Sequence, residues 1–153
     1  MDASVALAWC FPDEASAYAD GVLVALEGTA ILVPAVWGLE IANAMLVGER
    51  QKRLRAPEIQ RFTTLVENLS LVQDAQPVGE QVRNVLPLAR EYGLSAYDAA
   101  YLELAMRHGL PLATLDRKLQ KAAARAGVQI FPGDELDNVF RPVPSPRRVP
   151  PGP

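Results

Sequence analysis

Cysteine and histidine are almost absent from this chain of 153 residues, which contains one of each. The single cysteine, Cys10, excludes an internal disulfide and a cysteine-rich zinc site, and its neighbours Trp9 and Phe11 favour a plain buried thiol. The single histidine, His108, excludes a multi-histidine metal site. Because His108 precedes Gly109 at an expected helix end, we interpret it as part of a helix C-terminus.

Long apolar runs and an excess of positive charge are also missing. No run approaches the ~18 apolar residues that span a bilayer, and no basic start precedes an apolar stretch. We therefore expect a soluble cytoplasmic protein without a membrane partner. The net charge of −3 argues against binding nucleic acid through a general positive field. With 50% hydrophobic residues, the chain is long enough for one domain with a proper core.

Short apolar runs alternate with helical patterns along the chain. We predict strands at 31–33, 69–72, 112–115 and 128–131, and helices at 36–53, 56–68, 79–92, 95–108 and 116–126. Pro87 is expected to kink or split its helix, and Gly93 to end it. Strands that alternate with helices predict an α/β fold, with a central, mostly parallel sheet flanked by helices.

The two ends of the chain differ from this pattern. We expect one domain over residues 1–133, followed by a C-terminal segment, 134–153, whose tail from Pro142 holds six of the 13 prolines and is predicted to be disordered. At the other end, a strand should lead into Asp2, yet only Met1 precedes it. The first strand is either truncated, or the assigned start lies inside a longer reading frame; an apolar run upstream would restore the strand.

Four acidic residues stand among apolar neighbours, where a carboxylate is costly to desolvate: Asp2, Glu40, Asp98 and Asp116. Each has a structural explanation. Asp116 could cap the helix that follows it, Asp98 could pair with Ser95 in a capping box, Glu40 could face water, and Asp2 could lie in a frayed terminus. Taken together, the four acids need four separate structural explanations, and two of the acids follow positions where strands end.

A shared site is the alternative interpretation of these acids. Ligands bind beyond the carboxyl ends of the strands in an open parallel sheet, where Asp116 and Asp2 would lie. Four carboxylates close together repel one another unless cations compensate them. Mg²⁺ and Mn²⁺ prefer oxygen ligands, and one or two such ions would balance the charge without histidine, cysteine or a glycine-rich phosphate loop.

Four segments carry a family resemblance, and they occur in the family's order from residue 2 to about residue 131. They are Asp2-Ala3-Ser4-Val5-Ala6-Leu7, Leu39-Glu40-Ile41-Ala42-Asn43, Leu94-Ser95-Ala96-Tyr97-Asp98-Ala99-Ala100-Tyr101 and Leu112-Ala113-Thr114-Leu115-Asp116. The chain resembles the PIN domain and, more narrowly, the VapC toxins of bacterial toxin–antitoxin pairs.

The resemblance implies a metal-dependent endoribonuclease that requires Mg²⁺ or Mn²⁺. By carry-over, Asp2, Glu40, Asp98 and Asp116 would form the acidic metal site, and the supporting polar positions would be Ser4, Asn43 and Thr114. Metal-activated water would attack an RNA phosphodiester in line and leave a 5′-phosphate and a 3′-hydroxyl. The family also implies a cognate antitoxin that blocks the cleft, and a toxin homodimer.

Other assignments stay open from the sequence. The basic residues near Asp116 and around the end of the helix predicted at 36–53 could hold RNA backbone or could be solvated: Arg117, Lys118, Lys121, Arg50, Lys52, Arg53 and Arg55. Trp37 and Tyr97 could stack on bases, although packing is favoured. An aspartyl-nucleophile phosphatase is disfavoured, because position 4 is Ser rather than a second acid. A non-catalytic interaction module with a degenerate metal site is the main alternative.

Overall fold

The protein is described by a computed structural model, in which residues 1–132 are placed well enough to describe. The predicted boundary near residue 133 and the proline-rich tail lie outside these residues. In chain order, the helices and strands are α1 (Ala3–Cys10), the 3-10 helix η1 (Pro12–Glu14), α2 (Ala17–Ala25), β1 (Ile31–Val33), α3 (Trp37–Arg50), α4 (Ala56–Asn68), β2 (Leu71–Gln73), α5 (Val78–Tyr92), α6 (Ala96–His108) and α7 (Arg117–Arg125).

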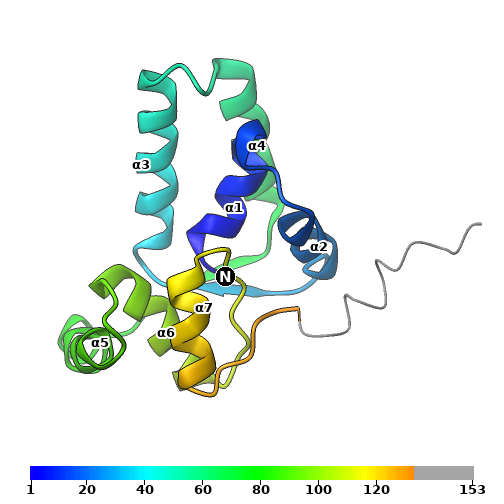
Figure 1. Ribbon diagram of the computed structural model, residues 1–153. Coiled ribbons are helices and arrows are strands. Elements are labelled where there is room, and N and C mark those ends of the chain that lie inside the picture. Colours follow the sequence, from blue (N-terminus) through cyan, green and yellow to red (C-terminus); the bar gives the residue numbers. More distant parts are fainter. Residues whose placement is uncertain (133–153) are drawn as a thin grey trace, which may run out of the picture.

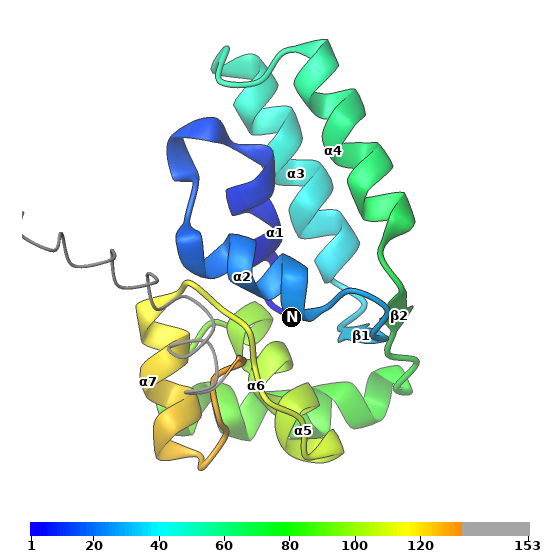
Figure 2. The same ribbon diagram turned by 90° about the vertical axis from the view of Figure 1, so that its right-hand side faces the viewer.

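The two strands lie between two groups of helices. Helices α1, α3 and α4 stand on one side of β1 and β2, and α5, α6 and α7 lie on the other (Figures 1 and 2). Strands β1 and β2 are parallel, with Ile31 opposite Leu71 and Val33 opposite Gln73. The predicted α/β architecture, with helices on both faces of a parallel sheet, is therefore confirmed, although the sheet is smaller than expected.

The strand predicted at 112–115 is wrong in its extent, as is the one at 128–131. In the described part of the chain these segments form a single parallel bridge between Leu112 and Ile130. Beyond Leu112 the backbone N–H groups bond to side chains instead of a neighbouring strand: Thr114 donates to the Tyr18 hydroxyl at 3.3 Å, and Leu115 donates to Ser4 Oγ at 2.9 Å. A ladder cannot continue where the neighbouring backbone is missing.

The helix boundaries follow local signals closely. Gly93 and Gly109 end α5 and α6 in the left-handed conformation, with φ of 65° and 61°. The helix predicted at 36–53 ends earlier, at Arg50, because Lys52 adopts a left-handed φ of 61°. Pro87 does not split α5, which is continuous from Val78 to Tyr92. Its ring lies on an exposed face, where the missing N–H costs least.

The strand predicted at 69–72 is displaced along the chain. Strand β2 runs from Leu71 to Gln73, and Leu69 instead closes α4 as its C-cap. The Ser70 carbonyl accepts from Ile31 N–H at 2.8 Å, and Asp74 N–H donates to the Val33 carbonyl at 2.9 Å. Pairing with β1 therefore fixes where β2 begins and ends.

The main core lies where the helices meet the strands. Its buried members include Ala6, Phe11, Ile31, Trp37, Tyr101 and Leu119. Cys10 is buried among them, as predicted, and burial raises the pKa of its thiol to about 11, so it is an unreactive packing group. Helix α3 approaches α1 closely at Gly48, where a Cβ atom would lie 2.5 Å from Phe11 Cε1.

Candidate functional site

Asp2 is a buried carboxylate held by two hydroxyl groups. Its side chain lies directly before α1 and is 6% exposed. Oδ2 accepts hydrogen bonds from Ser4 Oγ at 2.5 Å and from Thr114 Oγ1 at 2.7 Å. Ser4 lies in the first turn of α1 and Thr114 follows the Leu112 bridge, so residues 110 positions apart fix one carboxylate oxygen.

Glu40 is held by Tyr101 from the opposite group of helices. Glu40 lies in the first turn of α3, and its Oε2 accepts a hydrogen bond from the Tyr101 hydroxyl of α6. Tyr101 is fully buried. Because its ring cannot move far in the packed core, the hydroxyl sets where the Glu40 carboxylate lies.

Asp98 and Asp116 both serve as helix N-terminal residues. Ser95 caps α6: its Oγ accepts from Asp98 N–H at 3.0 Å and donates to Asp98 Oδ2 at 2.7 Å. This resembles the predicted capping box, except that the carboxylate bonds the Ser95 hydroxyl. Asp116 caps α7, and its Oδ1 accepts from Leu119 N–H at 2.7 Å. The predicted capping roles of Asp98 and Asp116 are therefore both confirmed.

The capping acids lie beside the buried Asp2 carboxylate. Asp116 N–H donates to Thr114 Oγ1 at 3.0 Å, and that same hydroxyl donates to Asp2. Burial raises the pKa of Asp2, and the nearby negative charge of Asp98 raises it further. Burial likewise raises the pKa of Glu40, with additional contributions from Asp2 and Asp98. Asp2, Glu40 and Asp98 thus lie close enough to repel one another.

The donor chemistry of this cluster fits a hard divalent cation. All four side chains offer carboxylate oxygens, and the observed hydrogen bonds engage Oδ2 of Asp2, Oε2 of Glu40, Oδ2 of Asp98 and Oδ1 of Asp116. A bound cation would relieve the repulsion among the negative charges of Asp2, Glu40 and Asp98. Within residues 1–132, however, no three acidic, histidine or cysteine side chains converge as ligands of a single ion.

The sequence gives no role to Tyr101, which contacts Glu40, and it predicts a supporting role for Asn43, which makes no hydrogen bond to the acids within residues 1–132. Tyr101 lies in one of the four family segments. Its position three residues after Asp98, on the same helix face, is the signal that the sequence offers. Asn43 lies exposed on α3, and no hydrogen bond joins it to the acids in the described part of the chain. Its predicted supporting role rests on sharing a helix face with Glu40.

The sequence of this chain matches a family model described as PIN domain over residues 1–125. The chain belongs to the PIN domain family. The match covers every element from α1 to α7 and all four acids, so the PIN fold and the acidic cluster occur in the same segment.

Two proteins of Pyrobaculum aerophilum are similar to this chain. Ribonuclease VapC3 of Pyrobaculum aerophilum is 29% identical over 119 residues, which cover 78% of this chain and 89% of the relative. The crystal structure of PAE2754 from Pyrobaculum aerophilum superimposes with a TM-score of 0.59 at 30% identity, over 79% of this chain and 76% of that one. This PIN domain is thus similar in sequence to a VapC protein and similar in structure to PAE2754.

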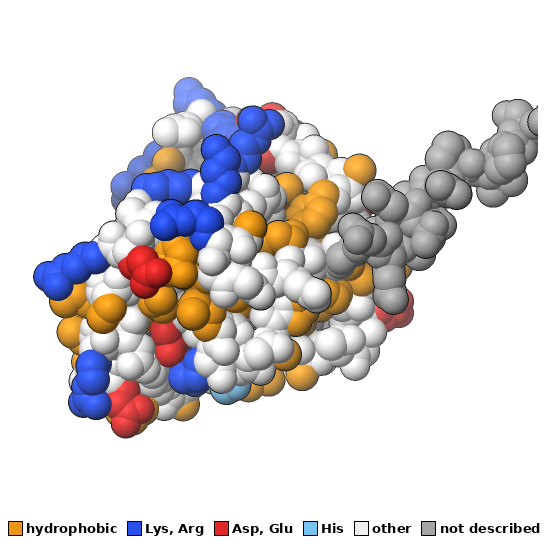
Figure 3. All heavy atoms as spheres, turned by 60° about the horizontal axis from the view of Figure 1, so that its bottom comes forward, with side chains coloured by type: hydrophobic (Ala, Val, Ile, Leu, Met, Phe, Trp, Pro, Cys, Tyr) orange, Lys and Arg blue, Asp and Glu red, His pale blue; other side chains and the backbone are white. Residues whose placement is uncertain are grey.

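One face of this PIN domain combines basic and apolar side chains. On the side of α5, α6 and α7, Lys and Arg side chains gather beside apolar ones (Figure 3). Tyr97, next to Asp98, is 62% exposed, whereas Trp37 is buried in the core, as favoured from the sequence. Among the described helices, none is both long enough and apolar enough to cross a membrane.

Proposed function

We propose that this PIN domain is a metal-dependent endoribonuclease of the VapC type, which hydrolyses RNA phosphodiester bonds. The observation that carries the proposal is the buried Asp2 carboxylate, fixed by Ser4 and Thr114 and repelled by the charge of Asp98. A buried acid with like-charged neighbours costs stability, and a site for a cation accounts for that cost. The similarity to a protein named Ribonuclease VapC3 supports the same activity.

The four acids would hold Mg²⁺ or Mn²⁺, and the hydroxyl groups would orient them. Asp2, Glu40, Asp98 and Asp116 supply only oxygen donors, which these ions prefer. The ion, when bound, would polarise the scissile phosphate and lower the pKa of an attacking water. Thr114 holds the oxygen of Asp2 and the backbone of Asp116 together, and so sets the spacing between the two acids.

RNA would approach along α7, which begins at Asp116. Arg117, Lys118 and Lys121 are exposed there, and among residues 1–132 no acidic partner is within ion-pair distance of them. Phosphate groups are attracted to such side chains without reading the base sequence. Arg53 is less available, because it pairs with Asp13 at 2.8 Å and Glu14 at 2.5 Å.

Arg55 and the remaining basic residues of the α3–α4 connection are weaker candidates for RNA contact. Arg55 pairs with Glu58 at 2.5 Å on the first turn of α4. Arg50 and Lys52 are exposed but lie at the far end of α3 from Glu40. We therefore propose that the RNA backbone contacts the basic residues of α7 rather than those of the α3–α4 connection.

A cognate antitoxin and a second copy of the toxin are the proposed protein partners. Large apolar side chains are exposed on α3, α5 and α6: Leu39, Leu46, Val78, Val82, Leu86 and Tyr97. On α5 the three valine and leucine positions recur every four residues, which places them on one helix face. Solvent exposure of such a face is costly for a monomer and favours coverage by protein.

The test is cleavage of structured RNA by the purified protein with Mg²⁺ or Mn²⁺, with and without EDTA. We expect EDTA to stop cleavage, and Asp98→Asn to reduce it by at least about a hundredfold while the circular dichroism spectrum stays unchanged. Asp20→Asn, an exposed acid on α2, is the matched control and should cleave normally. Normal cleavage by Asp98→Asn would refute the nuclease proposal in favour of a non-catalytic module.

A further inference from the structure

Thr114 joins two acids of the candidate site through one hydroxyl group. Its Oγ1 donates to Asp2 Oδ2 at 2.7 Å and accepts from Asp116 N–H at 3.0 Å. A hydroxyl group carries one proton and can also accept hydrogen bonds, so both bonds form at the same time. Thr114 is fully buried. Its position therefore sets how far the Asp2 carboxylate lies from the backbone of Asp116.

The backbone of Thr114 is held by side chains of two helices instead of by a neighbouring strand. Thr114 lies two residues beyond the bridge at Leu112. Its N–H donates to the Tyr18 hydroxyl of α2 at 3.3 Å, and its carbonyl accepts from Gln120 Nε2 of α7 at 2.9 Å. These two bonds take the place of the ladder bonds that fix a residue in a sheet. Tyr18 and Gln120 thus satisfy both backbone groups of Thr114.

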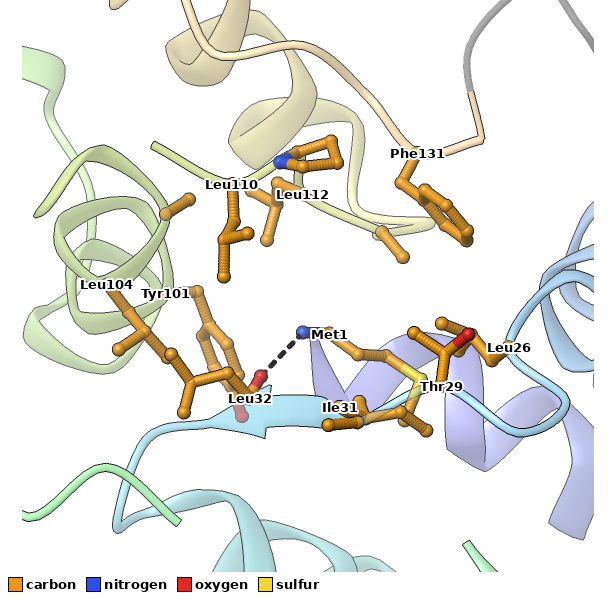
Figure 4. A pocket seen from close by; sticks show the side chains of 14 residues that line it. Met1, Leu26, Thr29, Ile31, Leu32, Tyr101, Leu104, Leu110, Leu112 and Phe131 are labelled. Carbon is orange, nitrogen blue, oxygen red and sulfur yellow. Dashed lines mark hydrogen bonds between the residues drawn. The ribbon is translucent and has the colours of Figure 1, made fainter. Parts of the chain in front are cut away.

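Tyr18 is itself fixed at its ring and at its hydroxyl group. The ring packs against the buried cluster that contains Ala113, and the hydroxyl donates to the Phe131 carbonyl. Phe131 N–H donates to the Leu112 carbonyl at 3.0 Å, and the Phe131 side chain points toward an apolar cavity of about 210 Å³ (Figure 4). Because the phenol proton is used on Phe131, the oxygen of Tyr18 is left to accept from Thr114 N–H.

Gln120 reaches back across the N-terminus of α7. Its backbone N–H donates to the Asp116 carbonyl at 2.9 Å, while its side chain bonds the Thr114 carbonyl. Asp116 caps the same helix through Leu119 N–H at 2.7 Å. The chain on both sides of Asp116 is therefore tied to α7, which restricts the backbone conformation of this acid.

We propose that Tyr18 and Gln120 are positioning residues of the metal site, which hold Thr114 so that its hydroxyl sets the spacing of Asp2 and Asp116. Within residues 1–132 neither side chain makes a hydrogen bond to an acid, so both act through Thr114. The proposal rests on the proposed function, in which these acids bind a divalent cation. Because Mg²⁺ demands near-ideal ligand geometry, a displaced carboxylate weakens its binding.

The first test needs no metal. Amide hydrogen exchange at Asp116, measured by NMR in EDTA, reports the bond from its N–H to Thr114 Oγ1. Tyr18→Phe keeps the ring and removes the hydroxyl, and Gln120→Met keeps the length of the side chain and removes its amide donor. Each variant should speed exchange at Asp116 at least about tenfold, because Thr114 is then held less firmly.

Two matched controls make the same chemical changes elsewhere. In Tyr92→Phe the ring lies at the end of α5, beside Arg125, and in Gln60→Met the side chain is exposed on α4. Neither change touches Thr114, so exchange at Asp116 should stay as in the unsubstituted protein.

The second test measures Mn²⁺ affinity by isothermal titration calorimetry. Tyr18→Phe and Gln120→Met should each weaken binding about five- to tenfold, as expected for residues that support metal ligands from behind. In a Thr114→Val background, which lacks the hydroxyl, Tyr18→Phe should cause a further loss of less than about twofold. In a Thr114→Ser background, which keeps the hydroxyl, the full effect of Tyr18→Phe should return. Circular dichroism checks that each variant is folded.

Two outcomes would overturn the proposal. One is unchanged exchange at Asp116 in Tyr18→Phe or Gln120→Met. The other is an equal loss of Mn²⁺ affinity from Tyr18→Phe with and without the Thr114 hydroxyl, because the effect would then not pass through Thr114. Faster exchange at Asp116 in a protein whose unsubstituted form binds no Mn²⁺ at millimolar concentrations would instead refute the proposed metal site, while supporting the hold of Tyr18 and Gln120 on Thr114.

Discussion

Replacing the buried acid of the cluster should stabilise the protein when no metal is present. In Asp2→Asn the carbonyl oxygen can still accept from Ser4 and Thr114, while the charge that burial disfavours is removed. Asp2 is only 6% exposed, so desolvation acts at nearly full strength. The expected gain is about 1–3 kcal/mol in the free energy of unfolding, or roughly 3–9 °C in Tm for a domain of this size.

The pH dependence of stability follows from the same carboxylate. Because burial raises the pKa of Asp2, the native state keeps its proton to a higher pH than the unfolded chain, whose value is about 3.9. The resulting stability is full below the unfolded pKa and is lost as pH rises through the folded pKa. Metal-free protein should therefore lose stability as the pH rises from about 4 through the raised pKa of Asp2, and Asp2→Asn should lose less.

The assay is thermal unfolding in EDTA from pH 4 to pH 8, followed by circular dichroism, and repeated with Mn²⁺. Added Mn²⁺ should raise the Tm of the unsubstituted protein and leave that of Asp2→Asn nearly unchanged. Asp20→Asn should show no gain in EDTA, since its carboxylate is exposed. A lower Tm for Asp2→Asn at pH 7.5 in EDTA would refute the reasoning, because it would mean that the charged form is the favoured one.

Three further substitutions test packing and the support of the acids. Gly48→Ala should destabilise the protein by about 1–2 kcal/mol, because the clash of the new Cβ atom with Phe11 outweighs the gain in helix propensity. Gly38→Ala on the same helix is the control: its Cβ atom meets nothing within 4 Å, so it should stabilise the protein. Thermal unfolding of both variants measures the two effects. Tyr101→Phe removes the hydrogen-bond donor to Glu40 and should weaken Mn²⁺ binding several-fold, as measured by calorimetry, while the circular dichroism spectrum stays unchanged. An unchanged Mn²⁺ affinity would mean that Tyr101 contributes only to packing.

Local signals predicted the helix ends and the caps well. Ser95 before Asp98, and Asp116 before α7, are capping patterns that depend on four neighbouring residues, so the sequence contains all that is needed. The positive φ of Gly93 and the end of α5 follow in the same way. These elements would form similarly in many folds, which is why the sequence indicates them.

Features that depend on distant residues were predicted less well. The pattern of 112–115 is typical of a strand, but a strand needs a neighbour. Among residues 1–132, the backbone bond on its open side comes from Asp2 N–H to the Ala113 carbonyl. The bond from Tyr101 to Glu40 joins positions 61 residues apart, so the spacing that places Tyr101 on the helix face of Asp98 does not identify Glu40 as its partner. The family resemblance predicts that the four acids lie in one region because it implies the fold of the chain. Their spacing in the sequence does not by itself imply a fold.

Binding of Mn²⁺ by the purified protein, measured by isothermal titration calorimetry, tests the central claim most directly. If Asp2, Glu40, Asp98 and Asp116 form one metal site, the protein binds Mn²⁺ at millimolar concentrations or below, and Asp98→Asn loses most of that affinity. Absence of binding by the unsubstituted protein at millimolar Mn²⁺, or equal binding by Asp98→Asn, would contradict the claim and favour a PIN domain without a working metal site.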